Sequence, residues 1–509
     1  MEWKEILNDY EKHIEQLESE KILSRQRMNK KGKNSAFDRI SLLLDEGTFK
    51  EIGKWRETDK RDGNLIKDKF LGDGVITGYG KIQNKLVYVY SEDFSVMGGS
   101  LGKVHAEKIV KIQDMALKNR APLICINDSG GARIEEGMAS LNGYANIFLR
   151  HVKASGVIPQ IAVILGPCAG GASYGPALCD FIFMVDGISK MFLTGPQVVK
   201  NVIGENVSSD ELGGSIVHTQ KTGIAHFSFE NEKLCLAEVR RLVTYLMNNN
   251  SLTLEKDKSK RLKMNTIQKM IYKLVPANPR KPYDMKSVLN LILDDNSLIE
   301  INTNYAKNVI VGLGKIEGIV IGIIANQPLH MCGAIDVNAS IKISRFVRMC
   351  DAFNIPLVVM VDVPAFMPGT KQETEGIIRN GAKIVFAFAE ATVPKISIIL
   401  RKAYGGAYIA MNSKGLGADV VYAWPNIEMS IMGADEAVKI IHKRDKDYNM
   451  VYASKEYREK FSEPYVIASE GYIDEIIKPD ETREKIYDAL IDLINGKKEQ
   501  SYKHSNIPL

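Results

Sequence analysis

The chain has 509 residues, of which 45% are hydrophobic and 25% are charged, and its formal net charge is +5 at pH 7. That length allows two or three domains with sizeable cores, and the composition excludes a disordered or fibrous chain. The small positive charge suits an anionic ligand. No basic run is interleaved with aromatic residues, which argues against a nucleic-acid partner.

The sequence predicts a cytoplasmic protein without direct membrane insertion. Its first residues, MEWKEILNDYEKH, are charged from the second position and are not typical of a secretory signal peptide. The longest uncharged stretch, 154–179, is interrupted by Pro159, Pro167 and Pro176, which favours buried strands and loops over a membrane span. The six cysteines show no CxxC pair and no His/Cys spacing that suits zinc, so we expect no metal; most of them lie in apolar runs, and there we expect buried free thiols.

Residues 1–35 predict an N-terminal amphipathic helix and a linker. Apolar Ile6, Tyr10, Ile14 and Leu17 recur at helical spacing among charged residues, and the basic sequence MNKKGKNS follows them. We expect this helix to lie on the body of the protein or on a partner subunit.

From residue 36 onward the chain repeats one plan twice. Matching residues keep an offset of 234 or 235, as in the pairs Gly78 and Gly312, Gly99 and Gly333, Asp128 and Asp362, and Gly171 and Gly406. Such a constant register over some ninety residues indicates an internal duplication.

Both halves have the pattern of α/β domains. Short β-branched runs alternate with helical patterns, which favours mostly buried strands. Between the halves, the polar stretch 248–263 is followed by VPANPRKPYD, whose three prolines interrupt helices and sheets. We therefore predict three parts, with residues 1–35, 36–275 and 276–509.

Two glycine loops occupy matching places in the halves. GPCAGGASYG (166–175) and RKAYGGAYIAM (401–411) each follow an apolar run and precede residues suited to a helix start. A strand, a glycine pair and a helix can direct backbone N–H groups at one point without interference from Cβ atoms. That arrangement suits a developing negative oxygen, as on a thioester enolate. For a single copy a glycine turn needed only for tight packing is the better explanation, but two copies favour a functional site.

A second pair of loops follows the preceding strand of each half. DSGGAR (128–133) comes directly after the apolar APLICIN, and VDVPAFMPGT (361–370) takes the equivalent place. With the glycine loops they give two comparable anion-stabilising corners, one in each half. Ser129 lacks the GxSxG elbow and an assigned histidine, so the sequence disfavours a serine hydrolase.

The remaining motifs have ordinary explanations. GYGKIQ (78–83) and GLGKIE (312–317) lack the Lys-Ser/Thr ending of a P-loop and the third glycine of a dinucleotide fingerprint, so we predict hairpin turns. Glu135, Glu136 and Glu373 are candidate bases, although surface exposure or helix capping is the default role for each.

The chain resembles the carboxyltransferase subunits of biotin-dependent acyl-CoA carboxylases, of the propionyl-CoA carboxylase beta chain type. It is also similar to the alpha chains of sodium-pumping methylmalonyl-CoA and glutaconyl-CoA decarboxylases. The motifs that carry the resemblance are DSGGARIEEG, GPCAGGASYGPAL, FLTGPQVVK, DELGGSIVHTQKTGIAHF, GIIRNGAK and ATVPKISIILRKAYGGAYIAM.

The resemblance implies two tandem crotonase-like (ClpP/crotonase) domains and a ring-shaped homo-hexamer. In such an assembly the active site lies between the first half of one subunit and the second half of another. The implied substrate is a coenzyme A thioester, and the implied cofactor is biotin. No MKM-type biotinylation site is present, so biotin must be carried as carboxybiotin on a separate biotin carboxyl carrier subunit, with a biotin carboxylase as a further partner.

The resemblance also implies roles for individual residues. The amides of Gly170 and Gly171 would hold the thioester oxygen, and those of Gly406 and Ala407 the ureido oxygen of biotin. Carboxybiotin releases CO2, its ureido nitrogen takes the α-proton of the acyl-CoA, and the enolate attacks CO2. The protein supplies orientation and oxyanion stabilisation rather than a side-chain base. The implied substrate-binding residues are Gly130, Gly131, Ala132, Gly333, Ala334, Tyr174 and Ile409.

Two positions depart from the family pattern. Ala365 stands where the family has a glycine, and Ile341 stands where many members have an aspartate. A glycine-to-alanine change is harmless where φ is negative and disruptive where it is positive. Apolar Ile409 fits a small unbranched or methyl-branched acyl chain, such as that of propionyl-CoA or acetyl-CoA.

Three other functions stay open at this point. The same chemistry can run in reverse in a sodium-pumping decarboxylase complex that acts on methylmalonyl-CoA or glutaconyl-CoA. The chain can instead be a non-catalytic subunit that binds acyl-CoA. A crotonase-fold hydratase or hydrolase would need an acid/base carboxylate beside the first glycine loop, and the sequence does not identify one.

Overall fold

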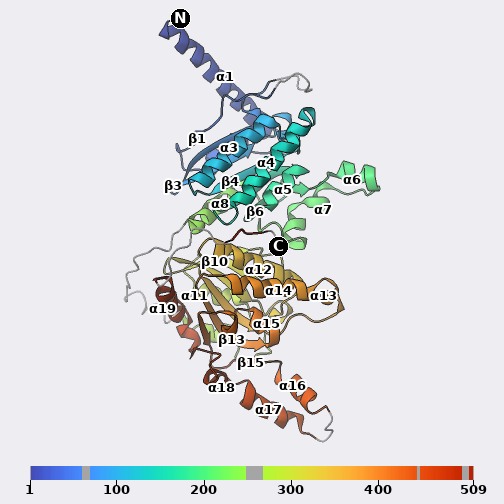
Figure 1. Cartoon of the computed structure of the whole chain (residues 1–509), viewed down its shortest axis with the longest axis vertical. Coiled ribbons are helices and arrows are strands. Elements are labelled where there is room, and N and C mark those ends of the chain that lie inside the picture. Colours follow the sequence, from blue (N-terminus) through green and yellow to red (C-terminus); the bar gives the residue numbers. More distant parts are fainter. Residues whose placement is uncertain (1, 60–68, 248–267, 444–447, 496–503, 508–509) are drawn as a thin grey trace. The chain divides into compact units, whose positions relative to one another are not determined.

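The computed structural model describes residues 2–59, 69–247, 268–443, 448–495 and 504–507. The chain forms two compact units, Met1–Met247 with His504–Pro508, and Asn248–Lys503 with Leu509 (Figure 1). The expected polar linker 248–263 lies outside the described residues, and the boundary near residue 275 stays a prediction.

The first unit contains an eight-stranded sheet in the order β1-β2-β3-β4-β5-β6-β8, with β7 paired to β5. β1 to β3 pair antiparallel, and β3 to β6 and β8 pair parallel. The strands are β1 (Lys50–Glu51), β2 (Val75–Ile82), β3 (Lys85–Glu92), β4 (Leu123–Ser129), β5 (Gln160–Ala169), β6 (Phe181–Val185), β7 (Lys190–Phe192) and β8 (Phe227–Phe229). The helices are α1 (Trp3–Asn29), α2 (Ala36–Leu43), α3 (Lys103–Lys118), α4 (Met138–Ala154), α5 (Gly171–Ala177), α6 (Pro196–Ile203), α7 (Ser209–Gly213) and α8 (Glu232–Leu246).

The second unit repeats this sheet in the order β16-β14-β13-β12-β11-β10-β9, with β15 paired to β13. Its strands are β9 (Ile299–Ile301), β10 (Val309–Ile316), β11 (Ile319–Asn326), β12 (Leu357–Val363), β13 (Lys395–Tyr404), β14 (Val420–Ala423), β15 (Glu428–Ser430) and β16 (Glu475–Ile476). Its helices are α10 (Ile271–Leu274), α11 (Met285–Ile292), α12 (Val337–Ala352), α13 (Thr370–Thr374), α14 (Ile377–Glu390), α15 (Gly405–Ala410), α16 (Ala434–Ile441), α17 (Met450–Phe461), α18 (Pro464–Ser469) and α19 (Thr482–Asn495).

The two sheets pair in the same register, as a duplication requires. Gly78 of β2 lies opposite Val89 of β3, and Gly312 of β10 lies opposite Ile323 of β11, so both pairs keep the offset of 234. Every residue of β4 and of its counterpart β12 is buried, as is typical of parallel strands covered on both faces. The predicted α/β fold with two tandem crotonase-like domains is confirmed.

The two glycine motifs that look like phosphate loops are hairpins. β2 and β3 are joined by Gln83 and Asn84, with φ of 46° and 64°. β10 and β11 are joined by Glu317 and Gly318, with φ of 49° and 80°. Two consecutive residues with positive φ make the tight turn that suits the twist of antiparallel strands. The prediction of hairpin turns is confirmed.

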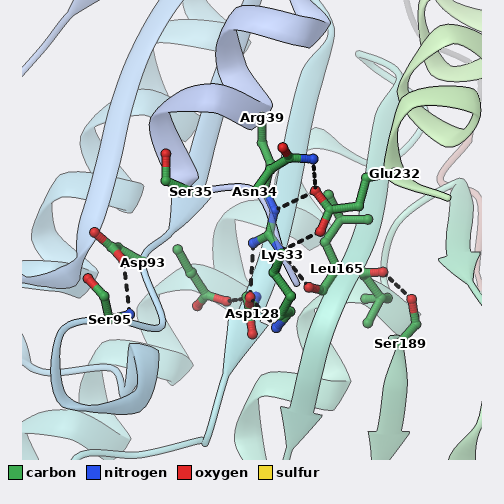
Figure 2. A network of polar contacts seen from close by, with 12 residues as sticks. Lys33, Asn34, Ser35, Arg39, Asp93, Ser95, Asp128, Leu165, Ser189 and Glu232 are labelled. Carbon is green, nitrogen blue, oxygen red and sulfur yellow. Dashed lines mark hydrogen bonds and ion pairs between the residues drawn. The ribbon is translucent and has the colours of Figure 1, made fainter. Parts of the chain in front are cut away.

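A buried ion-pair network fixes the end of β4 in the first unit (Figure 2). Arg39 of α2 contacts Asp128 of β4 at 2.9 Å and Glu232 of α8 at 2.8 Å, and these three side chains are at most 4% exposed. Lys33 adds a contact of 2.7 Å to Asp128, and Arg39 also donates to the carbonyl of Leu165 at 2.7 Å. The network therefore joins α2, α8, the end of β4 and the middle of β5.

The second unit neutralises its equivalent carboxylate from a different element. Arg401 of β13 contacts Asp362 of β12 at 2.8 Å and donates to the carbonyl of Lys281. The position in β5 that corresponds to Arg401 is Gly166, where a Cβ atom would run into the carboxylate of Asp128. Glycine in β5 thus leaves room for Asp128 and for cations from α2 and the segment before it.

We predict that replacing Arg39 with methionine destabilises the first unit by about 3–5 kcal/mol, because it leaves two buried carboxylates without their shared cation. The matched control is Arg25→Met, whose side chain is half-exposed and pairs with Asp38 at 2.5 Å. An exposed pair of this kind contributes about 0–1 kcal/mol. Urea and thermal unfolding measure the stability of both variants. Equal losses of stability would contradict the role of Arg39 in neutralising the buried carboxylates.

Candidate active site

Each unit carries a left-handed turn directly after its third strand. Met97–Gly99 have φ of 48°, 64° and 63°, and Met331–Gly333 have φ of 50°, 54° and 78°. L-residues such as Met97, Met331 and Cys332 rarely adopt this conformation, and they are held in it only where surrounding contacts support them. The shared geometry shows that the duplication extends to the loops.

Both turns lie against the end of the next strand. A Cβ atom on Gly333 would lie 2.9 Å from the carbonyl oxygen of Asp362, and one on Gly99 would run into the carbonyl of Asp128. Glycine at the third position of each turn is therefore required for close backbone approach.

Main-chain hydrogen bonds then tie each turn to the loop that follows the strand. The amide of Leu101 donates to the carbonyl of Gly131 at 2.9 Å, and the amide of Ile335 donates to that of Ala365 at 3.1 Å. These bonds show that Ala365 takes the structural place of Gly131. The structure thus brings the candidate residues Gly130, Gly131 and Ala132 beside the first turn.

The alanine at position 365 is accommodated without backbone strain. Gly131 has a φ of 108°, whereas Ala365 is absent from the positive-φ residues of the described chain. An alanine is therefore tolerated at position 365, because φ is not positive there. The two loops differ in backbone conformation at this position. The other departure, Ile341, lies partly buried on α12.

The first glycine loop connects β5 to α5. Gly170 has a φ of 60° and donates its amide to the carbonyl of Phe192 at 3.1 Å. Gly171 and Ala172 begin the helix, where amides have no acceptor four residues earlier within it. A Cβ atom on Gly171 would lie 2.9 Å from the ring of Tyr144, so this backbone lies directly on an aromatic ring.

The second glycine loop has the same form but is more open. Gly405 has a φ of 58°, and a Cβ atom there would lie 2.8 Å from the carbonyl oxygen of Ile431. At Gly406 an added Cβ atom would meet nothing within 4 Å, and φ is not positive. Ala407 has a buried side chain, so it can offer its backbone alone. Gly406 therefore borders open space.

Tyr174 and Ile409 occupy equivalent positions on α5 and α15. Each lies three residues after the second glycine of its loop, and the two residues are 52% and 50% exposed. Tyr174 packs edge-on against Phe148, with ring centroids 6.2 Å apart. Two half-exposed side chains thus stand beside the matching loops.

The side chains considered as nucleophile or base have structural roles. Ser129 is fully buried, and its hydroxyl donates to the carbonyl of Gly99 at 2.6 Å. Glu136 accepts the amide of Lys103 at 2.7 Å and so caps α3, which is the helix-capping role expected for it. Glu135 and Glu373 are exposed.

A buried carboxyl group, Glu92, lies behind the end of β4. It is 2% exposed, accepts the amide of Asp128 at 2.9 Å and lies 3.7 Å from His105. Burial raises the pKa of Glu92 to about 8 and lowers the pKa of His105 to about 3. The pair is therefore a protonated carboxyl beside a neutral imidazole at neutral pH, and neither group reaches the surface of the loops.

We predict that Glu92→Gln removes a pH-dependent contribution to stability. Since the pKa of Glu92 lies above its ordinary 4.5 in the folded state, the folded protein holds this proton more tightly than the unfolded chain. The free energy of unfolding then falls as pH rises from about 4.5 to about 8, by an amount on the order of a few kcal/mol. Denaturant unfolding at several pH values should show a smaller fall for Glu92→Gln, with the exposed Glu135→Gln unchanged. Parallel curves for wild type and Glu92→Gln would contradict the prediction.

The structure also brings together three groups that sequence spacing does not connect. Ligand atoms of Cys125, His151 and Cys179 lie within 4.8 Å of one another, and all three residues are buried. His151 Nδ1 already pairs with the side-chain oxygen of Gln160 at 2.7 Å, and a structural zinc site needs four ligands. We assign no metal to this cluster.

Several residues around the loops were not identified from sequence. Lys108 and Lys342 are each buried and donate to backbone carbonyls. Because the two lysines keep the offset of 234, a comparison of the two halves can identify them. Arg133 and Asn308 support the two turns from positions that do not correspond, so the repeat does not reveal them. Among the described helices, none is both long and apolar enough to cross a membrane.

Each unit of this duplicated α/β fold therefore carries a glycine loop between a strand and a helix, with backbone amides at the start of that helix. The sequence profile of the carboxyl transferase domain matches residues 27–507. The chain therefore belongs to the carboxyl transferase family and is a carboxyltransferase of the acyl-CoA carboxylase type, which confirms the resemblance predicted from sequence.

Similar proteins cover nearly the whole chain. The propionyl-CoA carboxylase beta chain of Roseobacter denitrificans is 48% identical over 484 residues, 94% of both proteins. The mitochondrial propionyl-CoA carboxylase beta chain of Homo sapiens is 50% identical over 491 residues, 94% of this chain and 89% of that one. The methylmalonyl-CoA decarboxylase subunit alpha of Veillonella parvula is 47% identical over 489 residues, 95% of both.

A solved structure shows the same fold. The 12S component of transcarboxylase, described as a hexamer with methylmalonyl-coenzyme A and methylmalonic acid bound, matches with a TM-score of 0.90 and 41% identity. The match covers 98% of this chain and 99% of that one.

Proposed function

We propose that this chain transfers a carboxyl group from carboxybiotin to the α-carbon of a short-chain acyl-CoA, with propionyl-CoA as the first candidate. The observation that carries the proposal is the pair of matching glycine loops, which follow the equivalent strands β5 and β13 of the two halves. The two named propionyl-CoA carboxylase beta chains support the acyl group.

The two loops would each hold one oxygen. The first loop, with Gly170 and Gly171, would hold the thioester oxygen of the acyl-CoA as it becomes an enolate. Because the amide of Gly170 is already donated to Phe192, the contact falls on Gly171 and on the next amide, that of Ala172. Helix-start amides of this kind stabilise a developing oxyanion.

The second loop, with Gly406 and Ala407, would hold the ureido oxygen of biotin. The open space at Gly406 fits a flat ring that must approach the backbone closely. Carboxybiotin supplies CO2 and the ureido nitrogen that accepts the α-proton. The protein then orients the two reactants and stabilises their oxygens, so no side-chain base is required.

The other candidate residues can be assigned to the same two sides, one for acyl-CoA and one for biotin. Gly130, Gly131 and Ala132 would line the acyl-CoA side, with Tyr174 at its rim. Gly333 and Ala334 would line the biotin side, with Ile409 next to the acyl chain.

The proposed reaction also implies a biotin carrier and an assembly of several copies of this chain. Biotin would arrive on a separate carboxyl carrier subunit that a biotin carboxylase recharges, and six copies of this chain would form the core, as in the transcarboxylase 12S hexamer. None of the six cysteines, all of which lie among the described residues, forms a disulfide, which supports a reducing, cytoplasmic location.

Carboxyl transfer can be measured with the purified protein, free biotin and methylmalonyl-CoA or malonyl-CoA. We expect propionyl-CoA or acetyl-CoA to form only when biotin is present, because biotin accepts the carboxyl group in this direction. Faster turnover of methylmalonyl-CoA would support propionyl-CoA as the forward substrate. Binding of CoA esters without biotin-dependent exchange would contradict the proposal and favour a non-catalytic subunit.

Gly406→Val tests the second loop most cleanly. Since φ is not positive at Gly406 and no atom lies within 4 Å of an added Cβ, the variant should fold normally while its side chain fills the proposed biotin site. We expect turnover to fall by roughly 10²–10³, the loss typical when one oxyanion donor no longer contacts its oxygen, because the valine side chain keeps biotin away from the amide. The control is Gly415→Val in the same unit, which also has open space and no positive φ. Equal activity of the two variants would contradict the assignment of Gly406.

A further inference from the structure

In each left-handed turn, the carbonyl of the last residue accepts a hydrogen bond from a buried side chain. In the first unit, the hydroxyl of Ser129 donates to the carbonyl of Gly99 at 2.6 Å. In the second unit, Asn326 Nδ2 donates to the carbonyl of Gly333 at 3.0 Å. Both donors are fully buried, so water does not compete for these bonds.

The next carbonyl along the chain is held in the same way. Arg133 Nη2 donates to the carbonyl of Ser100 at 2.9 Å, and Asn308 Nδ2 donates to the carbonyl of Ala334 at 2.7 Å. Arg133 is 1% exposed and Asn308 is 2% exposed. Each turn is therefore fixed at two consecutive carbonyls by buried side chains.

The four donors do not correspond in the duplication. At the offset of 234, their counterparts in the other half are residues without the same donor role, namely Val363 for Ser129, Met367 for Arg133, Glu92 for Asn326 and Gly74 for Asn308. The accepting carbonyls do correspond. The hydrogen bonds thus recur in both halves although the side chains that make them differ, which is what a requirement on the backbone itself produces.

Each donor is in turn supported by its surroundings. Arg133 contacts Asp73 at 2.6 Å and Glu136 at 2.7 Å. Asn308 also donates to Asp336 at 3.1 Å. The loop that carries Asn308 is clamped by Lys342, whose ammonium donates to the carbonyls of Asn302, Tyr305 and Val309 at 2.8–3.0 Å.

The physical need for these bonds lies in the turns. Met97, Met331 and Cys332 have positive φ without being glycine, a backbone conformation that is strained for L-residues. A turn with such strain relaxes unless its carbonyls are fixed. Relaxation would move Gly99 or Gly333 away from the strand end that it touches.

We propose that Ser129 and Arg133 in the first unit, and Asn326 and Asn308 in the second, are positioning residues for carboxyl transfer. They act through the two turns, and Ser129 and Arg133 govern use of the acyl-CoA whereas Asn326 and Asn308 govern use of biotin. The assignment of substrates to halves rests on the proposed function.

The test uses Ser129→Ala and Asn308→Ala in the full-length protein, with kcat/KM measured separately for the CoA thioester and for free biotin. We expect Ser129→Ala to lower kcat/KM for the CoA thioester by roughly 3- to 10-fold and to leave that for biotin unchanged, because one hydrogen bond is lost. Asn308→Ala should show the reverse. A loss of fold alone would lower both values together.

The controls remove buried donors elsewhere. Ser189 is buried and bonds to the carbonyl of Ile164, and Asn380 is buried and donates to the carbonyl of Gly376 at 3.0 Å. Ser189→Ala and Asn380→Ala should leave the ratio of the two kcat/KM values unchanged. If Asn308→Ala does not fold, Asn308→Leu keeps a similar side-chain size without a donor and without a second carboxyl group beside Asp336, and it gives the same readout.

The outcomes separate this proposal from the proposed function. An active wild type whose Ser129 and Asn308 variants change both substrates equally, or neither, would overturn the positioning roles. An inactive wild type would contradict the proposed function alone. Calorimetric affinity for methylmalonyl-CoA would then decide the role of Ser129, with unchanged binding by Ser129→Ala counting against it.

Discussion

Close approach of main chain to main chain, at the carboxyl ends of parallel strands, is the constraint on which both halves depend. Gly99 touches the end of β4, and Gly333 touches the end of β12, where a side chain would collide with a carbonyl oxygen. A site made of backbone amides needs such contacts, because amides cannot be aimed by rotating a side chain. Glycine makes the approach possible, and buried polar groups hold it.

The duplication has kept these interactions more strictly than the residues that make them. Asp128 and Asp362 are both buried at a strand end, yet one is neutralised mainly by Arg39 of α2 and the other by Arg401 of β13. The carbonyls of the two turns likewise keep their donors while the donors change. Each half has therefore retained the same backbone geometry while the supporting side chains diverged.

Much of this arrangement follows from the sequence. The constant offset between Gly99 and Gly333 indicates the repeat, and the glycine pairs at 170 and 405 mark the strand-to-helix loops. Repeating patterns are visible because both halves obey the same steric rule. Hairpins are equally visible, since turn residues are local in sequence.

The rest depends on contacts that one sequence does not reveal. Arg39 and Asp128 are 89 residues apart, and no periodicity connects them. The sign of φ at Ala365 decides whether its Cβ is tolerated, and only the backbone shows it. Asn308 supports the second turn from a position whose counterpart in the first half is Gly74, which has no side-chain donor, so comparison of the halves does not identify it.

The most direct test of the account is an experimental structure of the assembled protein with a CoA thioester and biotin bound. We predict that the thioester oxygen lies within hydrogen-bond distance of the Gly171 amide, and that the ureido oxygen lies within the same distance of the Gly406 amide. Oxygens bound by side chains, with both glycine amides facing away from the ligands, would contradict it.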